Sequence, residues 1–159
     1  MAQLNKLVER LIVARVEFVL VGGFAAVAYG VSLMTQDVDV CCPFSPQNLR
    51  SIEAAIKDLK PVHRMTPQKL PFVLTDELCA SLKNLYLDTD LGPLDCLSEV
   101  LGLGDFLEVK RRSIELTLPV GICPVLDIDA LISAKAATNR TRDRMTISQL
   151  KAIKERQGL

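Results

Sequence analysis

Two aspartates separated by one residue are the first side chains in this sequence with an evident chemical use. Asp37 and Asp39 lie in residues 35–41, where polar and apolar residues alternate ahead of Pro43. Such alternation predicts a β-strand, and side chains two positions apart on a strand point to the same face. Two carboxylates held that close repel each other unless a cation neutralises them, and oxygen ligands suit Mg²⁺ or Mn²⁺. The pair therefore predicts a metal site.

A third aspartate, Asp95, lies in the short strand-like run 93–97, between the apolar residues Leu94 and Cys96. Its apolar neighbours would face one side of the strand and leave the carboxylate on the other. If this strand pairs with residues 35–41, the three carboxylates converge. We therefore predict that Asp37, Asp39 and Asp95 are both metal ligands and catalytic residues.

A glycine pair, Gly22 and Gly23, separates the apolar run 17–21 from the alanine-rich run 24–29. This order predicts a strand, a tight turn and a helix, whose free backbone amides favour phosphate. Taken alone, the glycines would be better explained as a turn that needs positive φ. Beside the aspartates, they favour a triphosphate site, and the combination supplies the parts of a two-metal nucleotidyl transfer.

Basic residues near the C-terminus form the other candidate site element. A long helix is predicted to begin near Ala130, capped by Asp127 or Asp129, and the spacing of Lys135, Asn139 and Arg142 would place them on one face of it. A solvated basic face would show the same spacing. Lys135 has mainly apolar or small neighbours, so it would benefit from a nearby carboxylate or phosphate.

The remaining pattern indicates one domain over residues 1–159, of α/β (α+β) class, with a small mixed sheet flanked by helices. Its core would span about 17–126, followed by C-terminal helices over about 129–157. Further expected elements are an opening amphipathic helix, a helix over about 45–59, a hairpin of 85–89 with 93–97, strands 113–118 and 122–126, and a last helix begun by a capping box at Thr146 and Gln149. Residues 61–78, with three prolines, predict a loop or an irregular sheet edge.

Composition narrows the class of protein. Lys plus Arg and Asp plus Glu balance at 19 each, so no overall field would draw the chain to nucleic acid or to an anionic membrane. No apolar run approaches the ~20 residues needed to span a bilayer, and residues 1–10 are unlike a signal peptide, which predicts a cytoplasmic protein. Five cysteines without C-x-x-C spacing predict buried, reduced thiols, and with a single histidine they argue against zinc.

Four segments resemble the minimal nucleotidyltransferases of the polymerase β-like superfamily, in particular the bacterial AbiEii-type, toxin-related group. They are residues 18–30 (FVLVGGFAAVAYG) with 35–40 (TQDVDV), residues 93–97 (PLDCL), residues 129–135 (DALISAK) and residues 139–143 (NRTRD). The resemblance implies metal binding by the three aspartates, phosphate contact by Gly22 and Gly23, and nucleotide or structural roles for Lys135 and Asp143. We add Thr35 and Arg142 to the predicted cofactor-binding residues.

One position departs from the pattern of these relatives. Many of them carry an arginine or lysine just before the T-x-D-x-D strand, where this chain has Leu33 and Met34. Two functions are therefore expected. The first is an enzyme that transfers a nucleoside monophosphate from a nucleoside triphosphate to a hydroxyl of RNA, protein or a small molecule, with Mg²⁺ or Mn²⁺. The alternative is a non-catalytic module that acts with a partner protein or as a homo-oligomer, for example in a toxin–antitoxin or phage-defence system.

Overall fold

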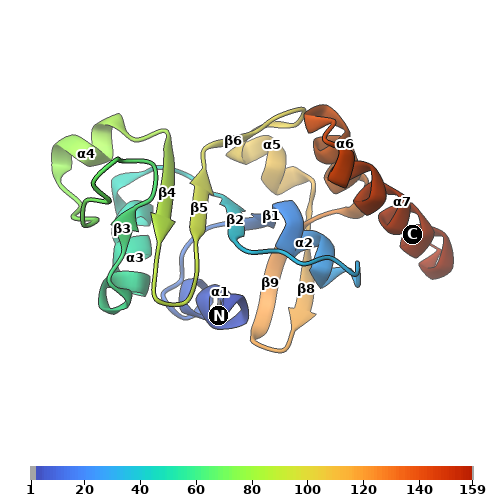
Figure 1. Cartoon of the computed structure of the whole chain (residues 1–159), viewed down its shortest axis with the longest axis horizontal. Coiled ribbons are helices and arrows are strands. Elements are labelled where there is room, and N and C mark those ends of the chain that lie inside the picture. The colour runs from blue at the N-terminus through green and yellow to red at the C-terminus, as the bar shows by residue number, and fades with distance from the viewer. Residues whose placement is uncertain (1–2, 159) are drawn as a thin grey trace.

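The computed structural model describes residues 3–158, so Met1, Ala2 and Leu159 of the predicted domain lie outside the described residues. A mixed sheet of seven strands runs through this part of the chain, with helices packed around it (Figure 1). The helices are α1 (Leu4–Val13), α2 (Gly22–Ala28), α3 (Pro46–Ile56), the 3₁₀ turn η1 (Lys57–Leu59), α4 (Asp76–Ser81), α5 (Phe106–Arg111), α6 (Ile128–Thr138) and α7 (Thr141–Gln157). The strands are β1 (Val19–Val21), β2 (Val38–Cys41), β3 (Val62–His63), β4 (Asn84–Asp88), β5 (Leu94–Leu97), β6 (Glu99–Val100), β7 (Gly104–Asp105), β8 (Ser113–Leu118) and β9 (Gly121–Leu126).

The strand order β3-β4-β5-β2-β1-β9-β8 puts the two predicted aspartate strands side by side at the centre of the sheet. β1 pairs with β2 antiparallel, and β2 pairs with β5 parallel. Val38 and Val40 on β2, with Leu94 and Cys96 on β5, are fully buried. The apolar residues thus face the core, as the alternation predicted, and the aspartates are left on the opposite face.

Local sequence explains where several helices begin. The Ser45 hydroxyl accepts a hydrogen bond from the backbone N–H of Asn48 at 3.2 Å, and Pro46 occupies the first position of α3. Of the two predicted caps of α6, Asp127 is the one used, because its carboxylate accepts from the N–H of Ala130 at 2.6 Å. Asp129 instead pairs with Lys154 of α7.

The predicted long C-terminal helix is wrong in its middle. α6 ends at Thr138, and Asn139 takes the left-handed conformation with φ 50°. The capping box predicted at Thr146 is also wrong, because α7 begins at Thr141 and Asp143 caps the backbone N–H of Arg140. Thr146 lies inside the helix, where its hydroxyl donates to the carbonyl of Arg142 at 3.2 Å. Lys135 therefore lies on α6 and Arg142 on α7, so the two residues do not share one face of a single helix.

Residues 61–78, predicted as a loop or an irregular sheet edge, include β3, which forms one edge of the sheet, and the start of the helix α4, which was not predicted. The short helix α5 and the β6–β7 pair were not predicted either. The expected strand 35–41 is shorter than its alternation suggested, since β2 starts at Val38 and Asp37 precedes it. The five cysteines are all free and buried, as predicted.

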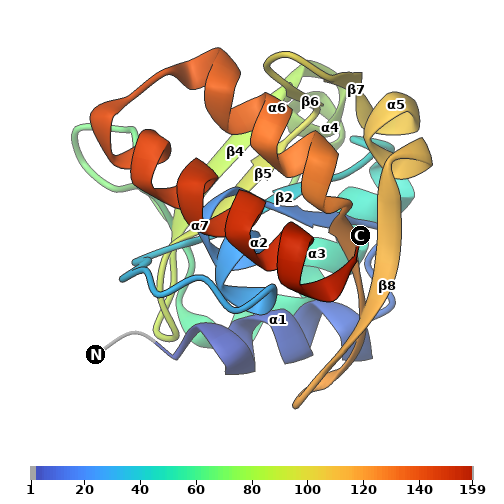
Figure 2. The ribbon, with the colours of Figure 1, turned by 90° about the vertical axis from the view of Figure 1, so that its right-hand side faces the viewer.

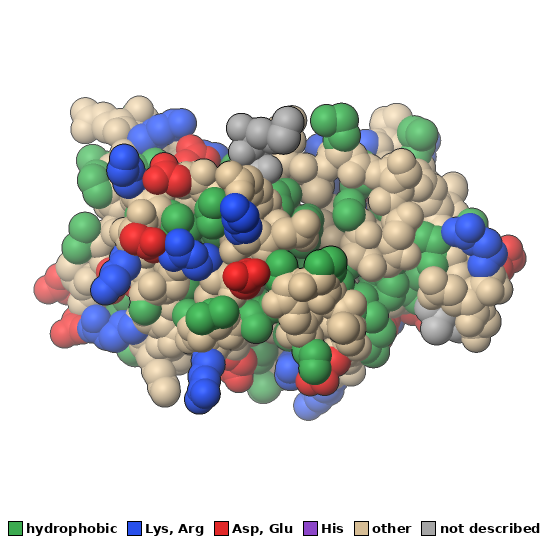
Figure 3. Space-filling view, turned by 90° about the horizontal axis from the view of Figure 1, so that it is seen from below, with side chains coloured by type: hydrophobic (Ala, Val, Ile, Leu, Met, Phe, Trp, Pro, Cys, Tyr) green, Lys and Arg blue, Asp and Glu red, His purple; other side chains and the backbone are tan. Residues whose placement is uncertain are grey.

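Two features of the surface bear on the composition. Figure 3 shows one face on which acidic and basic side chains are interspersed, in keeping with the balanced charge. No helix within residues 3–158 is both long and apolar enough to cross a bilayer.

Candidate metal and nucleotide site

The three predicted aspartates meet because of the register of two strands. β2 and β5 pair so that Asp39 lies directly beside Asp95, and Asp37 comes just before β2. One carboxylate oxygen from each residue lies within 4.8 Å of the others. The two strands pair, and the three carboxylates therefore converge, as the sequence predicted for that case.

This convergence has an electrostatic cost. Burial raises the pKa of Asp39 to about 7, and the negative charges of Asp37 and Asp95 add to the rise. Burial also raises the pKa of Asp95, although Arg64 opposes the change. A divalent cation would remove the repulsion, and three carboxylates are a donor set that suits Mg²⁺ or Mn²⁺. The residues present therefore fit the metal that the fold implies.

Gly22 leaves room for the carboxylate of Asp39. Its φ is +71°, and a Cβ on it would lie 2.2 Å from Oδ2 of Asp39. Only glycine fits both the positive φ and the close approach. A Cβ on Gly23 would lie 3.0 Å from Oγ1 of Thr35, whose hydroxyl donates to the carbonyl of Asp37 at 3.3 Å. The glycine pair thus packs against both ends of the aspartate segment.

Lys135 and Asp143 form the facing wall, and both are buried, with 7% and 2% of their surface exposed. Their charged atoms are 3.7 Å apart. Oδ2 of Asp143 also accepts from the Thr138 hydroxyl at 2.7 Å and from Nε of Arg140 at 2.9 Å. Burial alone would raise the pKa of Asp143, but the hydrogen bonds from Arg140 and Thr138 outweigh it and lower the pKa to about 2. Asp143 is thus an anion that orders the α6–α7 turn and holds Lys135.

Lys135 carries a charge that burial disfavours. Burial lowers the pKa of its ammonium group, while the carboxylates of Asp143 and Asp39 act in the opposite direction. Its position between the aspartate cluster and Asp143 matches the expectation that this lysine needs a nearby anion.

All nine predicted site residues line one cleft of about 400 Å³, which we call the carboxylate cleft. They are Gly22, Gly23, Thr35, Asp37, Asp39, Asp95, Lys135, Arg142 and Asp143. Leu33, Met34, Gln36, Arg140 and Thr146 complete its lining. Asn139, which shared the predicted helical face, is not part of it.

Two arginines near the cleft were missed as site residues. Arg140 lines the cleft beside Arg142, and its place in the segment NRTRD was the available signal. Arg64 donates a hydrogen bond to Oδ1 of Asp95. It lies in residues 61–78, the predicted loop or irregular sheet edge, and no local pattern marks it.

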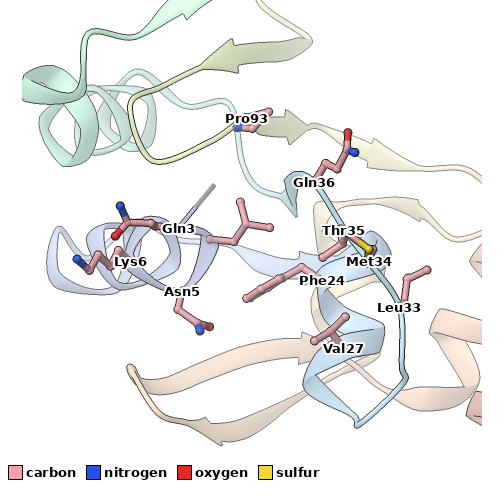
Figure 4. Close-up of a pocket in the computed structure, with 11 residues that line it drawn as sticks. Gln3, Asn5, Lys6, Phe24, Val27, Leu33, Met34, Thr35, Gln36 and Pro93 are labelled. Atoms are coloured by element: carbon pink, nitrogen blue, oxygen red, sulfur yellow. The ribbon is translucent and has the colours of Figure 1, made fainter. Parts of the chain in front are cut away.

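Two further cavities adjoin the carboxylate cleft. One, of about 810 Å³, lies against the other side of residues 33–36, between the start of α1 and the helix α2 (Figure 4). Phe24, Val27 and Leu33 contribute apolar walls to it. The other, of about 230 Å³, has walls such as Leu97, Val100 and Leu131 and shares Asp39 and Lys135 with the cleft.

The mixed sheet and its flanking helices resemble those of solved nucleotidyltransferases. The chain matches the lincosamide antibiotic adenylyltransferase LnuA, determined with lincomycin bound, with a TM-score of 0.64 and 16% identity over 95% of this chain and 96% of LnuA. The chain therefore has the nucleotidyltransferase fold.

Two other solved structures agree. A protein of Thermotoga maritima that was predicted to be a nucleotidyltransferase matches with a TM-score of 0.56 and 17% identity, over 94% of each chain. ANT(2″)-Ia in complex with adenylyl-2″-tobramycin matches with a TM-score of 0.52 and 12% identity, over 94% of this chain and 95% of that one. No protein-family model matches the sequence. No curated protein matches it significantly.

Proposed function

We propose that this protein transfers a nucleoside monophosphate from a nucleoside triphosphate to a hydroxyl group, with divalent metal held by Asp37, Asp39 and Asp95. The observation that carries the proposal is the in-register pairing of Asp39 with Asp95 across β2 and β5. It gathers three carboxylate oxygens within 4.8 Å of one another on the floor of a cleft whose other wall is basic. Basic side chains on one wall and metal-binding carboxylates on the other suit a triphosphate that is bridged to metal.

The bound metal would supply activation of the attacking hydroxyl and stabilisation of charge on the phosphates. The residues of the chain position the other groups. Lys135 and Arg142, aided by Arg140, offer positive charge to the triphosphate from the wall opposite the carboxylates. Gly22, Gly23 and Thr35 shape the edge of the cleft next to the aspartates. Asp143 acts through Lys135, because its carboxylate is already engaged by Thr138 and Arg140.

The structural neighbours suggest which substrates to test first. LnuA is an adenylyltransferase that was determined with lincomycin, and ANT(2″)-Ia was determined with an adenylylated tobramycin. By analogy, ATP is the first nucleotide and small hydroxyl compounds are the first acceptors to test, ahead of RNA and protein. The analogy rests on the fold.

A non-catalytic role is the second candidate, and one feature favours it. Leu33 and Met34 line the cleft at the place where the resembling proteins carry a basic residue, so one phosphate contact is missing. The AbiEii-type resemblance would then point to a partner protein, as in a toxin–antitoxin pair. Arg140 and Arg142 on the opposite wall weigh against this reading, since they supply positive charge by another route.

The test is incorporation of label from each α-³²P nucleoside triphosphate, with Mg²⁺ or Mn²⁺, into lincomycin, tobramycin, pooled RNA and pooled protein. Wild type is compared with Asp37→Asn, and with Asp90→Asn as the matched control. Asp90 is an exposed residue of the β4–β5 hairpin. Metal-dependent label that is lost only in Asp37→Asn establishes the transfer and its acceptor class. No label above the Asp37→Asn background with any nucleotide or acceptor would favour the non-catalytic module.

A further inference from the structure

Within residues 3–158, Arg64 is the one basic side chain that donates a hydrogen bond to a member of the aspartate cluster. It follows directly after β3 at the edge of the sheet. Its backbone N–H donates to the carbonyl of Tyr86 on β4 at 2.9 Å, and Tyr86 lies directly opposite Asp95 in the β4–β5 pairing. The guanidinium passes over the Tyr86 ring, 5.8 Å from its centre, to reach Asp95. The side chain therefore crosses the whole of β4 to contact the site.

The guanidinium is held from more than one side. Besides donating to Oδ1 of Asp95, it donates to the backbone carbonyl of Leu87 at 3.2 Å and lies 3.9 Å from Oδ1 of Asp88. Only 26% of the Arg64 side chain and 13% of the Asp95 side chain are exposed. A planar guanidinium fixed at one end to backbone imposes an orientation on the carboxylate at its other end. A flexible surface ion pair would not do so.

This contact distinguishes the two carboxylate oxygens of Asp95. Oδ1 accepts from Arg64, and the second oxygen is not engaged by that arginine. Asp95 would otherwise be free to rotate among two like-charged neighbours, Asp37 and Asp39. Groups that hydrogen-bond a metal ligand typically set its orientation, and their loss lowers metal affinity or activity by about 10- to 100-fold.

Resting on the function proposed above, we propose that Arg64 is a positioning residue that fixes Asp95 for metal binding in the carboxylate cleft. It acts through Asp95 and not on the substrate. The competing explanation is that Arg64 only braces the sheet edge through Leu87 and Asp88. The two roles differ in what happens to metal affinity in a protein that remains folded.

The experiment measures Mn²⁺ binding to the purified protein by the electron paramagnetic resonance signal of free Mn²⁺, without nucleotide. Arg64→Met removes the donor, and Arg64→Lys keeps the charge but loses the planar fork. Arg50→Met is the matched arginine control, because it breaks a surface pair with Asp76 whose side chains are 52% and 94% exposed. Asp88→Asn is the second control, since it disturbs the edge contacts of Arg64 but leaves its bond to Asp95.

We expect the Mn²⁺ dissociation constant to rise by about 10- to 100-fold in Arg64→Met, by less in Arg64→Lys, and not in the two controls. Unchanged affinity in a folded Arg64→Met would overturn the inference and leave Arg64 as an edge brace. If that variant does not fold, unchanged affinity in Arg64→Lys would have the same meaning. Absence of Mn²⁺ binding by wild type would overturn both this inference and the metal-dependent function. Unchanged affinity in the variant overturns only the role of Arg64, so the two failures are distinguishable.

Discussion

Gly22 and Asp39 are neighbours in space because the glycine has no Cβ. The aspartate fills the volume that a side chain at position 22 would take, with its Oδ2 2.2 Å from the place of that Cβ. The sequence suggested that the glycine pair admits a phosphate, and the structure adds that Gly22 admits a carboxylate. A glycine before a D-x-D strand is thus coupled to the second aspartate of that strand by direct packing.

Gly22→Ala should therefore weaken metal binding, in addition to straining the backbone at position 22. Positive φ costs an alanine about 1–2 kcal/mol, and the clash must also displace Asp39. Gly30→Ala is the matched control, because φ there is +104° but the added Cβ meets only Cδ1 of Ile153, at 4.0 Å. We expect both variants to lose stability in urea titrations, and Gly22→Ala alone to lose Mn²⁺ affinity. Equal Mn²⁺ affinity in the two variants would contradict the coupling.

Asp39 should destabilise the metal-free protein at neutral and higher pH. Its pKa is raised from 3.8 to about 7, so the unfolded chain ionises this group at lower pH than the folded protein does. The penalty is absent below about pH 4, grows as the pH rises toward 7, and is complete above that, at ~1.4 kcal/mol per pKa unit. In EDTA, Asp39→Asn should melt above wild type at pH 8 and together with it at pH 4.

Magnesium provides the second arm of this test. It should raise the melting temperature of wild type at pH 8 and have little effect on Asp39→Asn, because the variant has lost a ligand. A variant that melts below wild type in EDTA at pH 8 would show that Asp39 contributes packing that outweighs its electrostatic cost.

At the scale of elements, the turn between α6 and α7 shows what the sequence could and could not predict. Asp127 was among the predicted caps because an N-cap needs only local residues. The break at Asn139 was not predicted, because asparagine is a weaker helix-end signal than glycine, and residues 137–140 contain neither glycine nor proline. It depends on Asp143 folding back onto Thr138 and Lys135 across the turn, a tertiary interaction. Arg64 was missed for a similar reason, since its contact with Asp95 exists only after β3, β4 and β5 have paired.

Asp143 should stabilise this turn in a pH-dependent way. Its pKa is lowered from 3.8 to about 2, so its contribution is present above pH 4 and is lost as the pH falls through 2. The shift corresponds to about 2 kcal/mol, for a side chain that is only 3% exposed. Asp143→Asn should be less stable than wild type by about this amount in urea at pH 7, with a smaller gap at pH 3. Asp129→Asn, which breaks an exposed pair with Lys154, should cost under 1 kcal/mol. A gap that is independent of pH would show that Asp143 is not the ionised centre of the turn.

At the scale of the whole molecule, the cleft is built from parts that are distant in sequence and are linked by specific bonds. The Tyr29 hydroxyl at the end of α2 donates to the carbonyl of Leu126 at 2.6 Å, just ahead of α6. The N–H of Ser32 donates to Oε1 of Gln149 in α7 at 3.0 Å. In Figure 2, α7 passes in front of α2, and the bond from Ser32 to Gln149 joins α7 to the segment just after α2. The glycine turn, the aspartate strands and the α6–α7 turn therefore form one framework around the cleft.

A nucleotide that bridges these parts should protect all of them together from hydrogen exchange. The ligand would be the α,β-methylene analogue of ATP with Mg²⁺, at 100 times its dissociation constant. Local unfolding that releases this ligand should then cost about 2.7 kcal/mol more, which corresponds to a roughly 100-fold slowing of amide exchange. We expect this slowing at residues 22–24, 35–39 and 139–143 in wild type. Residues 114–118 of β8 serve as the internal control, because each has a backbone amide proton and none lines the cleft. Protection of the aspartate segment without the α6–α7 turn would mean that Lys135 and Arg142 do not hold the triphosphate, and would leave the basic wall without its proposed role.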